Sequence, residues 1–348
     1  MAALAAAILG LSRLAARQSN PPARPQWVVF LAPPGGAMEV WARPLDGGQA
    51  VQLSHTDGKV LGFTTAPDGK RIAYVVENGQ GGADLWLMGR QGENPHRLVD
   101  CGAQACFSPA WSPDGVRIAY SRGPLTTAYS PTRADRVWTV EAASGRTAPL
   151  YQDAAISGSQ PSWSPDGRRI ASYDAAAGAI RVLDLRSGHQ DVFQTDAVGV
   201  TWSPDGQELF YNVAEYIGEQ PHSDVYRADL TNATTAPFIQ DDAERVDCAL
   251  PAWSPDGRDG VIACRPGNPE AERLLYLIGL DGKMMSALPL NPAYNYSAYR
   301  WDAAGEALLF QRFRLEGAQS APDVLVWQRD SGQVKVVVQG AALPAWLP

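Results

Sequence analysis

The chain has 348 residues, 33 of them glycine and 27 proline, and it carries a formal net charge of −8. This turn-rich composition is typical of an all-β protein. The acidic balance, together with the lack of any basic run in the sequence, argues against nucleic acid as the main partner.

The first 26 residues differ from the rest of the chain. The apolar stretch Ala2–Leu11 is followed by Arg13 and Arg17, and it is shorter than the roughly 20 apolar residues that span a bilayer. It is similar to the apolar region of an export signal, although no basic residue precedes it. We expect an export signal or a membrane anchor, with a disordered tail as the alternative. Three prolines in residues 20–26 predict a linker, and a single domain is expected over 27–348.

From about residue 65 onward, one five-residue motif recurs along the chain. Trp-Ser-Pro-Asp-Gly begins at Trp111, Trp163, Trp202 and Trp253, and altered copies begin at Thr65 and Trp301. Counted from one aspartate to the next, the first five copies are separated by 46, 52, 39 and 51 residues. A period of about 40–50 residues indicates a stack or ring of supersecondary units.

The motif predicts the turn of a β-hairpin. Pro sets φ near about −65° at the first corner, Asp bonds the nearby backbone, and Gly supplies the positive φ that closes the turn. Structural roles are therefore assigned to the turn aspartates, which are Asp68, Asp114, Asp166, Asp205 and Asp256. The tryptophan is expected to pack neighbouring units together rather than to bind a ligand.

Each unit continues with a third and a short fourth strand, which is the pattern of a β-propeller blade. In the first unit, residues 27–30, 38–43 and 50–53 are predicted as the second, third and fourth strands. Pro344-Ala345-Trp346 repeats the sequence Pro109-Ala110-Trp111, so the C-terminal strand is expected to complete the N-terminal blade and close the ring. First strands near residues 62, 110, 162, 201, 252, 300 and 345 predict seven four-stranded antiparallel blades of about 46 residues. Six blades is the alternative, if the unit at Trp301 is irregular.

Tandem Trp-Ser-Pro-Asp-Gly-x-x-Ile-Ala-Tyr hairpins, each followed by a Leu-Trp or Val-Tyr strand, resemble the WD40-like propeller repeat of the TolB family. The resemblance covers nearly the whole chain after residue 26 and implies a binding propeller. Similar blades also occur in propellers attached to serine peptidases. The chain departs from TolB because it has no room for the small N-terminal α/β domain and because seven blades exceed the six of TolB. The Tol-Pal role of TolB is therefore not carried over.

The four cysteines form two candidate pairs. Cys248 and Cys264 each lie eight residues from Asp256 at a hairpin turn, so antiparallel pairing would place them opposite one another within reach of a disulfide. Cys101 and Cys106 are separated by four residues in a loop and could close a small ring. Two such pairs fit an oxidising, extracytoplasmic compartment, and four unrelated thiols are the alternative.

Candidate catalytic and metal-binding residues are sparse. The chain has four histidines, His55, His96, His189 and His222. They show no metal-ligand spacing, and the sequence contains no Gly-x-Ser-x-Gly nucleophile motif. One acidic cluster could hold Ca²⁺, although its spacing does not match an EF-hand and a solvated loop is the alternative; it consists of Asp241, Asp242, Glu244 and Asp247. We expect no metal and no cofactor.

Binding is expected on the face opposite the Pro-Asp-Gly turns, where the longest insertions gather. These insertions are Ser121–Asp135, Asn212–Ser223, Asn291–Ala298 and Gln311–Pro322. Their candidate binding residues are Tyr129, Arg133, Tyr216, His222, Tyr294, Tyr296, Arg312 and Arg314. Tyr and Arg are favoured at interfaces, and long loops on a rigid scaffold often carry binding.

The sequence therefore predicts a monomeric, non-enzymatic binding or scaffold propeller of the cell envelope or exterior, with a protein or glycan partner. One alternative is an enzyme with its site in the channel, such as a polysaccharide lyase or hydrolase. Another is a propeller accessory to a peptidase. The predicted first strands offer Pro, Ala, Ser and Trp rather than clustered ionisable residues, which favours the binding module.

Overall fold

The described part of the chain consists of β-strands, turns and loops, without a helix. The computed structural model describes residues 26–33, 37–125, 131–195, 199–217, 220–239, 247–265, 273–314 and 321–348. Within these ranges there is no helix of the length and apolarity that a membrane crossing requires. The expected export segment and all but the last residue of the expected linker lie outside the described residues.

The strands pair with their chain neighbours into antiparallel sheets. The first sheets, in pairing order, are β29 (Ala342–Leu347), β1 (Trp27–Ala32), β2 (Glu39–Pro44) and β3 (Val51–Gln52); β4 (Val60–Thr65), β5 (Arg71–Glu77), β6 (Ala83–Gly89) and β7 (His96–Val99); β8 (Ala105–Trp111), β9 (Arg117–Gly123), β10 (Arg136–Glu141) and β11 (Thr147–Pro149); β12 (Ser159–Trp163), β13 (Arg169–Asp174), β14 (Ala179–Asp184) and β15 (Gln190–Gln194).

The remaining sheets follow the same order. They are β16 (Thr201–Trp202), β17 (Glu208–Ile217), β18 (Gln220–Asp229) and β19 (Thr234–Pro237); β20 (Asp247–Cys248) and β21 (Ala252–Trp253), which both pair with β22 (Gly260–Arg265), then β23 (Leu274–Ile278) and β24 (Met284–Ala287); β25 (Asn295–Trp301), β26 (Ala307–Phe313), β27 (Asp323–Gln328) and β28 (Val334–Val338). A single parallel bridge, Ala83 to Ala105, joins the second and third groups into one larger sheet.

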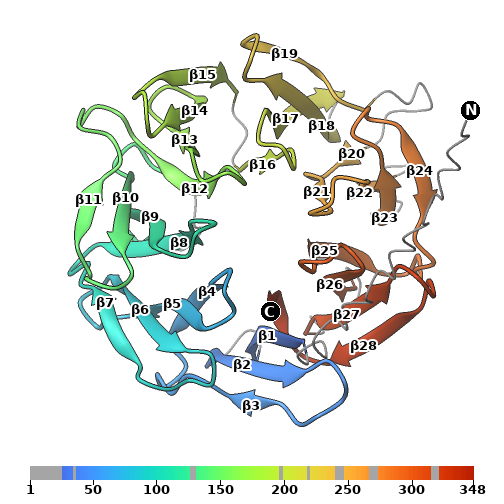
Figure 1. Cartoon of the computed structure of the whole chain (residues 1–348), viewed down its shortest axis with the longest axis horizontal. Coiled ribbons are helices and arrows are strands. Elements are labelled where there is room, and N and C mark those ends of the chain that lie inside the picture. Colours follow the sequence, from blue (N-terminus) through green and yellow to red (C-terminus); the bar gives the residue numbers. More distant parts are fainter. Residues whose placement is uncertain are drawn as a thin grey trace, which may run out of the picture.

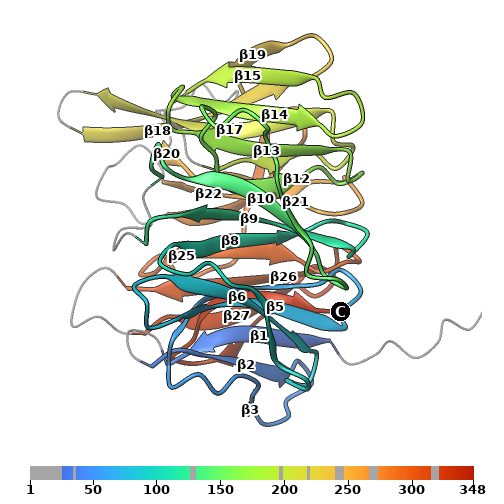
Figure 2. The same ribbon diagram turned by 90° about the vertical axis from the view of Figure 1, so that its left-hand side faces the viewer.

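These sheets follow one another around a ring, as in a β-propeller (Figure 1). The first strand of each group lies nearest the middle and the last lies at the periphery. Seen from the side, the strands run between the two faces of the ring (Figure 2). Apolar clusters lie between neighbouring sheets. In one of them, Val28 and Phe30 of β1 pack with Leu309 of β26 and Val326 of β27. Each sheet therefore buries its faces against the next.

The Trp of the repeated motif joins one sheet to the preceding one. In five copies its indole Nε1 donates a hydrogen bond to the carbonyl oxygen of the residue just before the corresponding position in the preceding repeat, whereas Trp253 Nε1 is buried without a partner among the described residues. The donor–acceptor distance is 3.1 Å from Trp163 to Ala110, 3.0 Å from Trp301 to Ala252 and 3.0 Å from Trp346 to Arg300. In the altered copy at Thr65, the hydroxyl donates instead to the carbonyl of Trp346, at 2.8 Å. The motif thus supplies both burial and a directional bond between sheets.

The Ser and Asp of the motif build the turn. In the copy beginning at Trp202, the Ser203 hydroxyl donates to Asp205 Oδ1 at 2.6 Å, and the backbone N–H of Gln207 donates to the same oxygen at 3.0 Å. Gly206 closes the turn at φ 70°. In the altered copy at Trp301, Asp302 takes the place of Ser and accepts from the N–H groups of Glu306 and Ala307. A carboxylate therefore replaces the Ser–Asp pair there.

Two disulfides link the four cysteines in the pairs that their spacing indicates. Cys248 and Cys264 are directly opposite partners on β20 and β22, with Cα atoms 4.1 Å apart. Cys101 and Cys106 join the end of one sheet to the start of the next, with Cα atoms 6.0 Å apart. Disulfides persist in oxidising surroundings, so both bonds fit an extracytoplasmic location.

Candidate functional site

On the face opposite the Pro-Asp-Gly turns, several segments that the sequence predicts as loops form β-strands instead. β17 and β18 pair without a break in register from Glu208–Asp229 to Ile217–Gln220, and Figure 2 shows this hairpin projecting from the ring. Ser121 lies in β9, Asn295–Ala298 in β25 and Gln311–Phe313 in β26. Local hydrophobic pattern underestimates these strands, because their ends carry polar residues and are held by cross-strand pairing. We call this side of the ring the loop face.

Tyr294, Arg312 and Arg314 come together on the loop face, and we call them the Tyr–Arg cluster. The Arg312 guanidinium lies 4.4 Å from the centre of the Tyr294 ring, and that of Arg314 lies 4.8 Å from it. Arg314 Nη2 also donates to the Tyr294 hydroxyl at 3.2 Å. Asp323 accepts from Arg312 at 3.0 Å and holds it in place. Two guanidinium groups on one ring form a preorganised, cationic and aromatic surface.

Tyr296 does not belong to that surface, and the expectation that it would bind a partner is wrong. Its side chain is only 3% exposed and packs on Phe310, with ring centres 5.8 Å apart. Its hydroxyl donates to the carbonyl of Asn291 at 2.8 Å, and burial raises its pKa. The residue faces the core because strand alternation places it on the opposite side of β25 from a solvent-facing position. It supports the segment that carries Tyr294.

The other candidate binding residues either lie elsewhere on the ring or have side chains outside the described part of the structure. Arg133 is exposed in the turn before β10, in a different sheet from the Tyr–Arg cluster. Tyr216 and His222 lie on the β17–β18 hairpin, in the pairs Tyr216–Pro221 and Glu215–His222; their side chains are outside the described residues, as is Tyr129. The structure therefore brings together Tyr294, Arg312 and Arg314, and leaves Arg133 apart.

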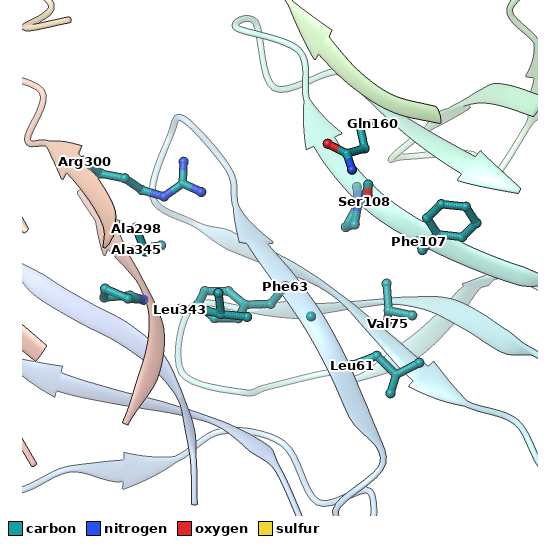
Figure 3. A pocket seen from close by; sticks show the side chains of 13 residues that line it. Leu61, Phe63, Val75, Phe107, Ser108, Gln160, Ala298, Arg300, Leu343 and Ala345 are labelled. Atoms are coloured by element: carbon teal, nitrogen blue, oxygen red, sulfur yellow. The ribbon is translucent and has the colours of Figure 1, made fainter. Parts of the chain in front are cut away.

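A cavity of about 510 Å³ opens among the inner strands. Figure 3 shows its walls. The walls come from β4, β5, β8, β12, β25 and β29. Four lining residues have positive φ, namely Ser108, Gln160, Ala298 and Leu343, at 49° to 52°. Each lies at a β-bulge, three residues before a motif Trp. An extra residue at a bulge re-aims the strand, so the same irregularity in several repeats shapes the cavity wall.

Arg300 is the lining residue that sequence reasoning missed. It precedes Trp301, and its side chain is exposed to the cavity. The residue before the Trp-equivalent position is Thr, Ala or Ser in the other repeats, at Thr64, Ala110, Ser162, Thr201, Ala252 and Ala345. Arg300 thus departs from the Pro, Ala, Ser and Trp expected in the first strands, although one arginine is not the cluster of ionisable residues that a channel-site enzyme would need. Aligning the repeats on their Trp would have exposed the exception.

The acidic cluster considered for Ca²⁺ is described only at Asp247. That carboxylate forms an ion pair with Arg273 Nη2 at 2.6 Å. The cluster's other members, Asp241, Asp242 and Glu244, lie outside the described residues. Among the residues that are described, no three His, Cys, Asp or Glu side chains gather in a way that could hold a metal ion.

The comparisons with known proteins find short sequence matches. No protein-family profile matches the chain. Dipeptidyl-peptidase 5 of Porphyromonas gingivalis is 29% identical over 114 residues, which is 29% of this chain and 17% of that protein. The Tol-Pal system protein TolB of Xanthomonas oryzae is 45% identical over 53 residues, 14% of this chain and 12% of TolB. The matched stretches thus span less than a fifth of these relatives.

Solved structures match over most of the chain. TolB from Acinetobacter baumannii superposes with a TM-score of 0.52 at 18% identity, covering 92% of this chain and 83% of that one. A prolyl endopeptidase superposes with a TM-score of 0.65 at 12% identity, covering 90% of this chain and 50% of that one. At such identities the likeness shows the fold, which is an all-β propeller of the kind found in both proteins.

Proposed function

We propose, on the premise that the chain is a TolB-like β-propeller, that it is a non-enzymatic binding or scaffold module that engages a protein or glycan through its loop face. The observation that carries this proposal is the Tyr–Arg cluster, in which Arg312 and Arg314 flank the Tyr294 ring. Tyr and Arg are enriched among residues that dominate binding energy. Their side chains are ordered before any partner arrives, which reduces the entropy lost on binding.

We further propose that the propeller has seven blades and that the C-terminal strand closes the ring. Support comes from the pairing of β29 with β1, from the two hydrogen bonds of Trp346, and from the single bridge, Ala83 to Ala105, that joins strands β4–β7 to strands β8–β11. Deleting residues 342–348 tests closure. We expect the truncated protein to lose cooperative unfolding and to aggregate, because both edges of the ring become exposed. An unchanged thermal transition would contradict closure.

An extracytoplasmic location is proposed on the two disulfides, with tethering through the N-terminal segment as a further proposal. Fractionation of cells that produce the full chain tests both. The protein should appear outside the cytoplasm with its four cysteines unreactive toward a thiol label. A cytoplasmic protein with four labelled thiols would contradict the proposal. Size-exclusion chromatography with light scattering tests the expected monomer.

Variants of the Tyr–Arg cluster test the binding role. Wild-type protein, Tyr294→Ala/Arg314→Ala and the matched control Arg133→Ala would be compared by surface plasmon resonance against partners identified by crosslinking in the envelope fraction and on a glycan array. We expect the double variant to bind at least about tenfold more weakly, since two anchor side chains are removed. Arg133→Ala removes an exposed loop-face Arg outside the cluster and should bind normally. Equal affinities of all three proteins would refute the proposal.

A second candidate function is that of a propeller accessory to a peptidase. It is favoured by the likeness to the prolyl endopeptidase, half of whose chain is covered. The test is whether the purified protein forms a stable complex with a peptidase from the same cells and changes its rate on long peptides. The absence of any change in rate or substrate length would exclude this role.

A further inference from the structure

One wall of the central cavity carries an arginine, Arg300, whose side chain forms no hydrogen bond or ion pair with the described residues. Arg300 lies on β25, and its guanidinium extends into the cavity, with Ser108 and Gln160 on the facing wall (Figure 3). Among the described residues, the Arg300 side chain has neither an ion-pair partner nor a hydrogen-bond partner. The cavity lining contains no Asp or Glu. Arginines elsewhere in the fold are paired, such as Arg273 with Asp247.

Arg300 presents an unpaired charge to the cavity. Its side chain is open to the cavity but encircled by the inner strands, and the desolvation lowers the pKa of the guanidinium. Arginine stays protonated in proteins, so the charge remains, and among the described residues no acid faces it. An anion that entered the cavity could pair with it through charge-assisted, bidentate hydrogen bonds.

The backbone around Arg300 is anchored on both sides. Its own carbonyl accepts from Trp346 Nε1 at 3.0 Å. The preceding residue, Tyr299, donates its hydroxyl to the carbonyl of Leu250, and the following residue, Trp301, donates to Ala252 at 3.0 Å. The strand that carries Arg300 is therefore fixed, and only the Arg300 side chain has to be ordered when a ligand binds. Such a fixed backbone is more typical of a binding site than of an arginine that lies by chance on an open surface.

The remaining walls select the rest of the ligand. Leu61, Phe63, Val75, Phe107 and Leu343 supply aliphatic and aromatic surface. The polar side chains besides Arg300 are those of Ser108 and Gln160. A saccharide presents many hydroxyl groups that would need partners here, and each one left unpaired weakens binding. A carboxylate attached to an apolar chain matches both the cation and the apolar walls.

We propose that this cavity binds the free C-terminal carboxylate of a peptide that ends in an apolar residue, with Arg300 as the group that recognises the carboxylate. A volume of about 510 Å³ lies within the range of roughly 300–1,000 Å³ that is usual for small-ligand pockets. The site is separate from the Tyr–Arg cluster and goes beyond the proposed function of the loop face.

Isothermal titration calorimetry with defined probes tests the proposal. The probes are N-acetyl-Ala-Ala-Leu with a free carboxylate, its C-terminal amide, digalacturonate and inorganic phosphate. We expect the free acid to bind and the amide to bind about 10- to 100-fold more weakly, since a hydrogen-bonded charge is lost. Arg300→Gln should weaken binding of the acid by a similar factor, and Arg300→Lys should retain part of the affinity because it retains the charge.

A second pair of variants leaves Arg300 intact. Ala345 occupies the corresponding position on the neighbouring strand and also lines the cavity. Ala345→Asp should supply an internal carboxylate that neutralises Arg300 and abolishes binding of the peptide acid, whereas the equally sized Ala345→Asn should bind it. These variants decide the question even if Arg300→Gln does not fold.

Four results would overturn the proposal. They are equal binding of acid and amide, wild-type affinity in Arg300→Gln, equal affinity of Ala345→Asp and Ala345→Asn, and no binding of the peptide acid by the folded wild-type protein. Tighter binding of digalacturonate or phosphate would overturn the peptide assignment. The Tyr294→Ala/Arg314→Ala protein should bind the peptide acid normally, so the fate of this site and that of the loop-face function are separable.

Discussion

Arg329 joins two neighbouring sheets through a carboxylate that is nearly inaccessible to solvent. It follows β27 and contacts Asp259, which precedes β22, through two hydrogen bonds of 2.7 and 2.8 Å. Asp259 is only 7% exposed. Arg329 also donates to the carbonyl of Gly305 at 2.8 Å and stacks over Trp301, 4.4 Å from the ring centre. Replacing Arg329 by Met keeps much of the apolar stem but leaves the carboxylate without its cation.

The expected destabilisation follows from that geometry. Removing one partner of a buried ion pair costs about 3–5 kcal/mol, and the residual exposure of both side chains, 16% and 10%, places this pair near about 3 kcal/mol. For a chain of 348 residues, an unfolding entropy of about 2.1 cal/mol/K per residue gives about 0.7 kcal/mol/K. Arg329→Met should therefore lower the melting temperature by about 4 °C.

Differential scanning calorimetry and urea unfolding measure the effect. The matched control is Arg258→Met, because Arg258 pairs on the surface with Glu306 at 2.7 Å and with Asp256, and exposed pairs contribute little. Its melting temperature should change by less than about 1 °C. The double variant Asp259→Asn/Arg329→Met removes the stranded carboxylate and should recover part of the loss. The reasoning is refuted if Arg329→Met and Arg258→Met behave alike, or if the double variant is no more stable than Arg329→Met.

Two further predictions concern the disulfides and the motif turns. Replacing Cys248 and Cys264 by Ala removes a disulfide that spans 16 residues and should lower the free energy of unfolding by about 3 kcal/mol. Replacing Cys101 and Cys106, whose disulfide spans 5 residues, should lower it by about 2 kcal/mol. Urea unfolding measures both losses, and a larger loss for the shorter link would contradict the prediction. Hydrogen bonds from the Ser254 hydroxyl, and after it from the side chain and backbone N–H of Arg258, lower the pKa of the Asp256 carboxyl from 3.8 to about 2. Because the folded pKa is the lower one, its stabilisation is complete above about pH 4 and is lost as the pH falls through about 2. Asp256→Asn should therefore be less stable than wild type at neutral pH and equally stable below pH 2, and a gap in melting temperature that persisted there would refute the assignment.

Local chemistry allowed much of the fold to be predicted from sequence. The Pro-Asp-Gly turns require a positive φ at Gly, and Gly69, Gly115, Gly167, Gly206 and Gly257 adopt φ between 64° and 70°. The cysteine pair about Asp256 could be predicted because a tight turn makes residues equidistant from it into cross-strand partners. The resemblance to TolB-like propellers rests on the same repeated hairpins and is confirmed by the fold.

The sites were harder to predict because they depend on side-chain direction. Tyr294 and Tyr296 are two residues apart and were expected to share a surface, yet the structure stacks Tyr294 beneath two arginines and buries Tyr296 against Phe310. The first residue lies just before β25, where the chain is free of the strand's alternation, and the second lies within it. The start of β25 therefore decides that Tyr294 lies at the surface and Tyr296 in the core, and the ends of strands are weakly encoded in local sequence.

The sequence by itself therefore determined the repeat, its turns, its disulfides and the class of fold, because each depends on residues close together along the chain. The tertiary structure alone decided which residues meet from different repeats. Arg312 and Arg314 reach Tyr294 across a strand pair, and Arg300 opens into a cavity whose other walls come from strands up to about 240 residues away. Bulges and the packing of one sheet on the next set those meetings, and neither is visible within a single repeat.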